Sequence, residues 1–205
     1  MEERERRVSQ HTELRVAQSD QSPPKIVGYA ARFGSKADLG GFVEQIAPGA
    51  FARAIKDRQD VRALFNHDPN YVLGRTAANT LAMREDETGL WIEVTPPDTT
   101  WARDLMTSIS RGDVSQMSFA FAVRGKNGHK FDKSQDPPVR TLLDVDLFDV
   151  SPVTYPAYQD TQVSVRALTE AKEAAVDVQA DATGADGDQA AAELARMRLR
   201  IAELE

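Results

Sequence analysis

Three residues of this 205-residue chain have the types that acyl transfer needs: His67, Ser118 and Asp149. Such chemistry uses a hydroxyl as nucleophile, an imidazole that takes its proton, and a group that orients the imidazole. The order His, Ser, acid differs from the orders in chymotrypsin, subtilisin and the α/β-hydrolases, and no G-x-S-x-G elbow surrounds Ser118. The three residues therefore predict an acyl-transfer unit on a different fold.

Ser118 lies in an apolar run, residues 115–123, whose alternation is typical of a β-strand. The large apolar side chains of this run share one face, which we expect to be core: Met117, Phe119, Phe121 and Val123. Ser118 lies on the other face among small residues, which would leave room for an extended peptide beside the hydroxyl. The competing interpretation is an ordinary strand serine bonded to backbone, so the whole set of residues has to decide.

His67 follows an apolar run and precedes Asp68, so it lies where a strand gives way to a turn. Imidazoles titrate near neutral pH and therefore suit a general base. Asn66 and Asp68 favour turns, so a histidine with only a turn role is the alternative. The other histidines are less well placed, because His11 lies in a polar N-terminal segment and His129 in a polar loop.

Three acids compete for the orienting role: Asp144, Asp146 and Asp149. Period-two alternation along residues 143–150 puts Asp149 on one face with the aliphatic residues of this run. An ionised carboxylate in such a place is costly unless a partner compensates it, and a histidine N–H is such a partner. This pattern favours Asp149, and we interpret Asp144 and Asp146 as a solvated stripe.

The elements that position these residues are mostly short strands. Residues 61–65 and 90–94 read as strands, and residues 85–89 predict a hairpin turn. One helix is predicted around residues 51–55, and a second has Trp101, Leu105 and Ile109 at every fourth position before a stop at Gly112. Residues 125–136 form a polar loop long enough to gate a site. Many strands with few helices predict an α+β, mainly β fold that is a closed or nearly closed barrel.

Composition allows one hydrophobic core and disfavours several classes of ligand. The chain is 41% hydrophobic and 28% charged, and without cysteine it has no disulfide, cysteine nucleophile or thiolate metal site. We expect no membrane partner, because no apolar run approaches the roughly 20 residues that span a bilayer. A net charge of −7 with scattered basic residues disfavours nucleic acid. We expect neither metal nor cofactor, because the histidines lack ligand spacing and the glycines form no phosphate loop.

The chain divides into four parts. Residues 1–24 are polar and highly charged and are predicted to be a mobile N-terminal arm, and residues 25–169 form the barrel domain. Residues 170–190 are an acidic, Ala/Gly-rich linker. Residues 191–205 are an amphipathic C-terminal helix, either a frayed terminus or a docking helix. Its apolar seam consists of Leu194, Met197, Ile201 and Leu204.

Several motifs between about residues 26 and 166 share their order and spacing with a known family. They include Gly28-Tyr29-Ala30, Ala47-Pro48-Gly49-Ala50-Phe51, Asn66-His67-Asp68, Val72-Leu73-Gly74-Arg75, Met117-Ser118-Phe119 and Val150-Ser151-Pro152-Val153. With these motifs the chain resembles the prohead maturation proteases of tailed bacteriophages of the HK97 type, which are distant relatives of the herpesvirus assemblins.

The resemblance implies a serine endopeptidase with a herpesvirus-protease-like β-barrel and flanking helices. It makes Ser118 the nucleophile, His67 the base and Asp149 the orienting acid. Proteases of this family often carry Glu before the Val-Ser-x-Val stretch, and assemblins use a second His. Aspartate here is thus a departure from the family pattern.

The resemblance also implies where and on what the protein acts. Its substrates would be capsid-protein and scaffold segments and its own tails, inside the assembling prohead in the host cytoplasm. Self-association as a dimer is implied too, because the assemblins are activated by dimerisation. The apolar seam of residues 191–205 separately suggests docking to a scaffold or to a sister subunit. The alternative function is a non-enzymatic capsid-assembly or scaffold protein that retains the fold.

Overall fold

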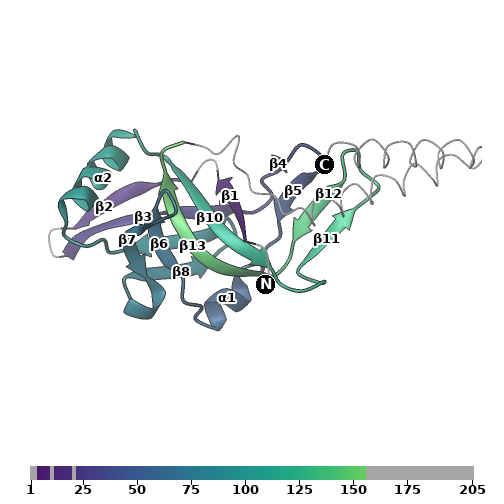
Figure 1. Cartoon of the computed structure of the whole chain (residues 1–205), viewed down its shortest axis with the longest axis horizontal. Coiled ribbons are helices and arrows are strands. Elements are labelled where there is room, and N and C mark those ends of the chain that lie inside the picture. The colour runs from purple at the N-terminus through teal and green to yellow at the C-terminus, as the bar shows by residue number, and fades with distance from the viewer. Residues whose placement is uncertain (1–3, 10–11, 20–21, 156–205) are drawn as a thin grey trace, which may run out of the picture.

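A computed structural model of the chain describes residues 4–9, 12–19 and 22–155, which form three β-sheets with two α-helices (Figure 1). The five-stranded sheet has the order β1 (Glu5–Ser9), β10 (Gln116–Val123), β13 (Val145–Val153), β6 (Arg62–Phe65) and β7 (Asp68–Arg75). The β3 sheet has the order β2 (Arg15–Ser19), β3 (Ser22–Arg32), β9 (Gly89–Val94) and β8 (Leu81–Glu85). The β12 sheet has the order β11 (His129–Asp132), β12 (Val139–Leu142), β5 (Val43–Ile46) and β4 (Ala37–Asp38). The helices are α1 (Ala52–Lys56) and α2 (Thr100–Arg111), with a 3-10 turn at Thr76–Ala78.

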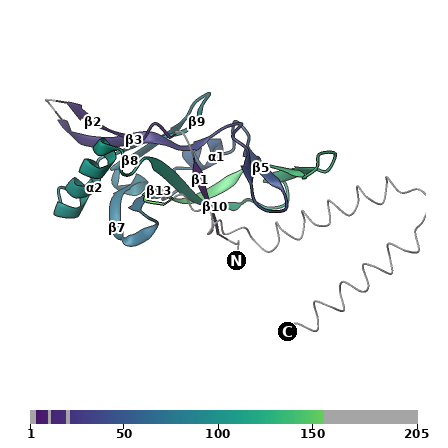
Figure 2. The same cartoon turned by 90° about the horizontal axis from the view of Figure 1, so that it is seen from above.

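The prediction of a mainly β fold with few helices is confirmed. Among the described residues none of the three sheets closes on itself, so the closed barrel is not confirmed. Figures 1 and 2 place α2 at one end of the molecule and the β12 sheet at the other, with β1 between them. Within the described ranges no helix is long and apolar enough to cross a membrane.

Local sequence signals place the two helices and one hairpin as predicted. Helix α2 buries Ala102, Leu105 and Ile109 and ends at Gly112, whose φ of 84° suits a residue without a Cβ atom. Helix α1 buries Ala54. Strands β8 and β9 pair in antiparallel fashion around the predicted turn. These elements supply much of the core beneath the five-stranded sheet.

Strand β10 is central to the five-stranded sheet and carries Ser118. Its large side chains Met117, Phe119 and Phe121 are buried in the core, as the alternation predicts. The opposite face, predicted to be open, is covered in this structure, because Ser118 is only 2% exposed and Ala120 is fully buried. The strand is therefore enclosed on both faces.

A β-bulge in β13 changes which of its residues share a face. Ala120 of β10 lies opposite Asp149, but the next residue, Phe121, lies opposite Leu147, which leaves Phe148 as an extra residue. Directly opposite residues of an antiparallel pair point to the same face. Asp149 therefore shares the face of Ala120, and the prediction that it shares the face of Leu147 is wrong.

The N-terminal segment belongs to the sheets, so the prediction of a mobile arm over residues 1–24 is wrong for its described part. Strand β1, strand β2 and the start of β3 all lie in this segment. Its polar side chains are accommodated because Glu5 and Arg7 are buried in ion pairs with Arg140 and Glu44. Polarity predicts mobility only when no buried partner is available.

The polar loop predicted at residues 125–136 contains a strand. Strand β11 pairs with β12, and this backbone ladder orders residues whose composition suggested a loop. The ring of Phe131 also packs edge-on against that of Phe42, with 5.5 Å between centroids. The loop prediction is wrong for His129–Asp132.

The described part of the predicted 25–169 domain reaches residue 155. The predicted linker at residues 170–190 and the predicted C-terminal helix at residues 191–205 lie outside the described residues.

Candidate active site

His67 lies in the two-residue hairpin turn between β6 and β7. Phe65 pairs with Asp68, and the two residues between them, Asn66 and His67, have φ values of 53° and 58°. Positive φ at both central residues is a property of the type I′ turns that connect antiparallel strands tightly, and Asn and His tolerate this region better than most residues. The turn therefore fixes the position of the imidazole at the end of a rigid hairpin.

Asn66 attaches this turn to the end of β13. Its backbone N–H donates to the carbonyl of Pro152 at 3.0 Å. Its side-chain carbonyl accepts from the backbone N–H of Thr154 at 2.9 Å, and its amide donates to the Thr154 hydroxyl at 3.1 Å. These bonds offset the unfavourable backbone conformation and hold His67 over the five-stranded sheet.

Ser118 and Asp149 are brought to one face by the register of β10 and β13. Ser118 lies opposite Ser151, and Ala120 lies opposite Asp149. Alternation within β10 puts Ser118 and Ala120 on the same face, so all four residues share it. Asp149 is only 4% exposed, and a carboxylate at such a buried place needs hydrogen-bond partners to offset the cost of burial.

The imidazole of His67 bridges the hydroxyl and the carboxylate. His67 Nε2 lies 2.7 Å from Ser118 Oγ, and His67 Nδ1 lies 2.5 Å from Asp149 Oδ1. A carboxylate at Nδ1 favours the tautomer that carries its proton there, which leaves Nε2 to accept from the Ser118 hydroxyl. The arrangement can remove a proton from Ser118 as its oxygen attacks an acyl group.

Ser151 completes this arrangement, and sequence reasoning did not identify it as a functional residue. Its hydroxyl donates to Asp149 Oδ1 at 3.0 Å and accepts from the backbone N–H of His67 at 3.3 Å. The side chain is fully buried. A hydroxyl two residues from the favoured acid, on the same side of a strand, was the signal that could have found it.

The other acids and histidines that the sequence offers lie in different contacts. Arg53 of α1 binds both remaining acids, with its Nε 2.9 Å from Asp144 Oδ1 and its Nη2 2.5 Å from Asp146 Oδ1. The predicted solvated stripe is therefore an ion-paired one. His129 accepts from the side chain of Arg140 at 2.9 Å in the β12 sheet, and position 11 lies outside the described residues.

The surroundings of Asp146 lower the pKa of its carboxyl. Burial raises the pKa of its carboxyl, but hydrogen bonds from Arg53 and Gln59 and the charges of Arg53 and Arg124 outweigh this and leave the pKa below its usual value. Asp146 is therefore a structural carboxylate. Within the described part of the chain, no group of three or more His, Asp and Glu side chains is arranged to hold a metal ion.

A hydroxyl, an imidazole and a carboxylate in one hydrogen-bonded series are the arrangement of a serine protease. The family model described as Caudovirus prohead serine protease matches residues 10–175, so the chain belongs to this family. The protein is thus a serine protease of bacteriophage prohead maturation.

The chain is similar to the solved structure of the bacteriophage T4 capsid assembly protease, gp21. The two share 12% sequence identity with a TM-score of 0.48, and the similarity covers 75% of this chain and 99% of the other. No curated protein matches the chain.

Proposed function

We propose that His67, Ser118 and Asp149 are the catalytic residues of this protease. The observation that carries the proposal is the His67 ring, whose two nitrogens contact Ser118 Oγ and Asp149 Oδ1 at 2.7 and 2.5 Å. Each of the three side chains comes from a different strand or turn, so chance proximity in sequence does not account for the contact. The family to which the chain belongs is one of serine proteases, which supports a serine as the nucleophile.

In the proposed mechanism Ser118 Oγ attacks the scissile carbonyl while His67 Nε2 takes its proton. Asp149 stabilises the resulting imidazolium and keeps its proton on Nδ1. His67 then gives the proton at Nε2 to the leaving amine as the tetrahedral intermediate collapses to an acyl-enzyme. A water molecule, deprotonated by His67 in turn, releases the acid product and restores Ser118.

Ser151 and Asn66 act as positioning residues in this proposal. Ser151 holds Asp149 by a hydrogen bond and also contacts the backbone N–H of His67, so it fixes two of the three catalytic groups relative to each other. Asn66 fixes the turn that carries His67. Removal of a positioning residue lowers the catalytic rate because the catalytic groups are then less precisely placed. This holds even though the positioning residue touches no substrate.

We also propose that the substrates are segments of capsid protein and scaffold, and of the enzyme's own tails, cleaved inside the prohead in the host cytoplasm. The family membership supports capsid-related substrates. Self-association, as a dimer or through residues 191–205, and the herpesvirus-protease-like barrel belong to the same proposal. The dimer and the barrel rest on the resemblance of the sequence motifs, and self-association through residues 191–205 rests on the apolar seam of that segment.

Labelling with a serine-directed fluorophosphonate tests the proposed nucleophile. Parent protein should be labelled, Ser118→Ala should not, and Ser110→Ala should be labelled as the parent is. Ser110 is a matched control because it is an exposed serine on α2 whose hydroxyl only donates to the carbonyl of Met106. Loss of labelling in the control, or its persistence in Ser118→Ala, would contradict the assignment.

Co-expression with the capsid protein, followed by mass spectrometry, then tests the substrate class. The parent should produce fragments of capsid protein that Ser118→Ala does not produce. Intact capsid protein in both samples would count against these substrates without touching the assignment of the nucleophile.

A further inference from the structure

Strand β1 occupies the edge of the strand that carries Ser118. The register places Val8 directly opposite Ser118 and Arg7 opposite Phe119. The other edge of β10 pairs with β13, the strand of Asp149. Extended peptides commonly bind proteins by adding a strand to a sheet edge, where main-chain hydrogen bonds supply affinity. On β10 the edge beside Ser118 is the one that β1 covers.

The candidate nucleophile is closed to a polypeptide in this arrangement. Ser118 is 2% exposed and the side chain of His67 is 8% exposed. A protease that acts on protein segments must bring a backbone carbonyl to within contact of the serine oxygen. Some part of the chain must therefore move before a substrate strand can lie beside β10.

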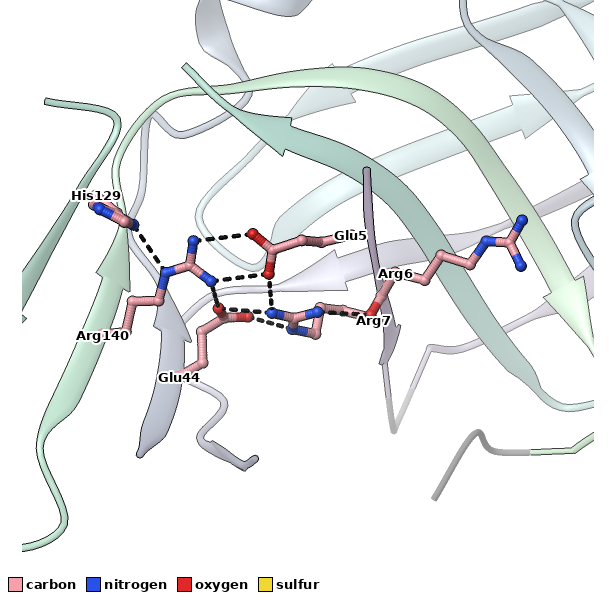
Figure 3. Close-up of polar contacts among 6 residues, drawn as sticks. All are labelled: Glu5, Arg6, Arg7, Glu44, His129 and Arg140. Carbon is pink, nitrogen blue, oxygen red and sulfur yellow. Dashed lines mark hydrogen bonds and ion pairs between the residues drawn. The ribbon is translucent and has the colours of Figure 1, made fainter. Parts of the chain in front are cut away.

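Strand β1 is held mainly by polar contacts, and its contact with the core includes the guanidinium of Arg7, which lies 5.3 Å from the centroid of the Phe121 ring. None of its residues belongs to the hydrophobic core, and its buried side chains include Glu5 and Arg7. Figure 3 shows how these two side chains meet Glu44 of β5 and Arg140 of β12. Arg7 Nε lies 2.6 Å from Glu44 Oε1, and Arg140 Nη1 lies 2.9 Å from Glu5 Oε2.

The charged cluster consists of four side chains: Glu5 and Arg7 from β1, and Glu44 and Arg140 from the β12 sheet. The two charges on β1 also pair with each other, and so do the two on the β12 sheet. Arg7 Nη2 lies 2.5 Å from Glu5 Oε2 on β1, and Arg140 Nη1 lies 2.9 Å from Glu44 Oε2 on the β12 sheet. Separation of β1 from the sheet therefore leaves two neutral pairs. Breaking a buried ion pair is costly mainly because it strands one uncompensated charge, and this cluster avoids that outcome.

One further observation sets β1 apart from the rest of the sheet. The family match covers residues 10–175 and so begins after β1 ends at Ser9.

We propose that β1 is a displaceable strand that holds the place of the substrate, and that substrate segments bind as an extended strand along the same edge of β10. The inference rests on the proposed role of Ser118. Displacement breaks the five-residue ladder of β1 and the contacts of Glu5 and Arg7 with the β12 sheet, and an incoming peptide replaces the ladder. In the closed state the strand keeps a capsid-maturation protease from premature cleavage.

A reversible cross-link in the full chain tests this inference. Arg6 and Ala120 are directly paired across β1 and β10, and the chain contains no cysteine, so the double variant Arg6→Cys with Ala120→Cys has a single thiol pair. Fluorophosphonate labelling of Ser118 should be at least about tenfold slower in the oxidised protein. The disulfide prevents β1 from leaving β10, so the molecules in which Ser118 is accessible are no longer populated. A reductant should restore the rate.

Each single-cysteine variant is the matched control and should label at the same rate with and without reductant. Equal rates for the oxidised and reduced double variant would overturn the inference. Absence of labelling in the parent and in every variant would instead refute the proposed nucleophile, so the two failures are distinguishable.

A deletion of residues 1–9 provides a second test that needs no cross-link. We expect the deleted protein to fold, to label faster than the parent, and to be slowed again by an added peptide of residues 4–9. An unfolded deletion variant would show that β1 is an integral part of the domain. A folded variant that labels at the parental rate would show that β1 does not guard Ser118, and either result overturns the inference.

Discussion

Replacing Asp149 by asparagine removes one charge at the centre of the site and leaves nearly the same shape. Both hydrogen bonds that Asp149 accepts, from His67 Nδ1 at 2.5 Å and from Ser151 Oγ at 3.0 Å, go to Oδ1. An amide can present its own oxygen at that place, so the bonds can survive. What is lost is the negative charge that stabilises the imidazolium formed in the transition state.

The expected loss of rate follows from the interaction between the Asp149 carboxylate and the His67 imidazolium. Two unit charges about 4 Å apart interact by about 4 kcal/mol at an effective dielectric constant of 20. Since about 1.4 kcal/mol corresponds to a factor of ten in rate, kcat should fall by about a thousandfold. If the amide turns its NH2 group toward His67, the ring takes the other tautomer and the loss rises to about ten-thousandfold.

The assay is the rate of peptide cleavage, with Asp146→Asn as the matched control. Asp146 undergoes the same chemical change two strand positions from the bulge, but its partners are Arg53 and Gln59. The control should retain nearly full activity, and circular dichroism should show both variants folded. A loss below about tenfold in Asp149→Asn, or an equal loss in the control, would refute the assignment of the orienting acid.

The remaining predictions concern support of the site, packing, pH and the N-terminus. Ser151→Ala should lower kcat by about ten- to a hundredfold with little change in KM, because a hydrogen bond to a carboxylate is worth about 1.5–3 kcal/mol; an unchanged kcat would count against a positioning role. Gly89→Ala should lower the free energy of unfolding by about 3 kcal/mol in urea titrations, because its Cβ would lie 2.0 Å from the carbonyl oxygen of Ala31. The lowered pKa of Asp146 adds stability that is present above its usual value of 3.8 and is lost as the pH falls through the folded value. Asp146→Asn should therefore destabilise at pH 7 by about 1 kcal/mol, and this effect should shrink as the pH falls below 3.8, the usual pKa of the carboxyl. Removal of residues 1–24 should unfold the protein by circular dichroism, because it deletes β2 and the start of β3; a folded product would contradict this.

Elements with local signals could be predicted from the sequence. Trp101, Leu105 and Ile109 recur at helical spacing, and Gly112 stops the helix with a backbone conformation that favours glycine. The hairpin of β8 and β9 follows from turn residues between two apolar runs. Such features depend on residues a few positions apart, which is the range over which sequence patterns carry structural information.

The N-terminal strand could not be predicted in this way. Its order depends on Glu44 and Arg140, which lie 37 residues from Arg7 and 135 residues from Glu5. The sequence shows that Glu5 and Arg7 are charged, but it does not show that the fold brings them together with Glu44 and Arg140. The same holds for Ser151, whose role depends on the backbone N–H of a residue 84 positions away.

The bulge in β13 explains how one strand serves both the core and the site. Strict alternation would put Asp149 on the face of Leu147, which is buried in the core away from Ser118. The extra residue, Phe148, reverses the parity, so that Leu147 keeps its place opposite Phe121 while Asp149 comes opposite Ala120. Alternation favours Asp149 as the orienting acid because it places this residue on the apolar face of Leu147. The structure places it on the opposite face. Its burial instead comes from the enclosed face that it shares with Ser118, where the imidazole of His67 and the hydroxyl of Ser151 compensate its charge.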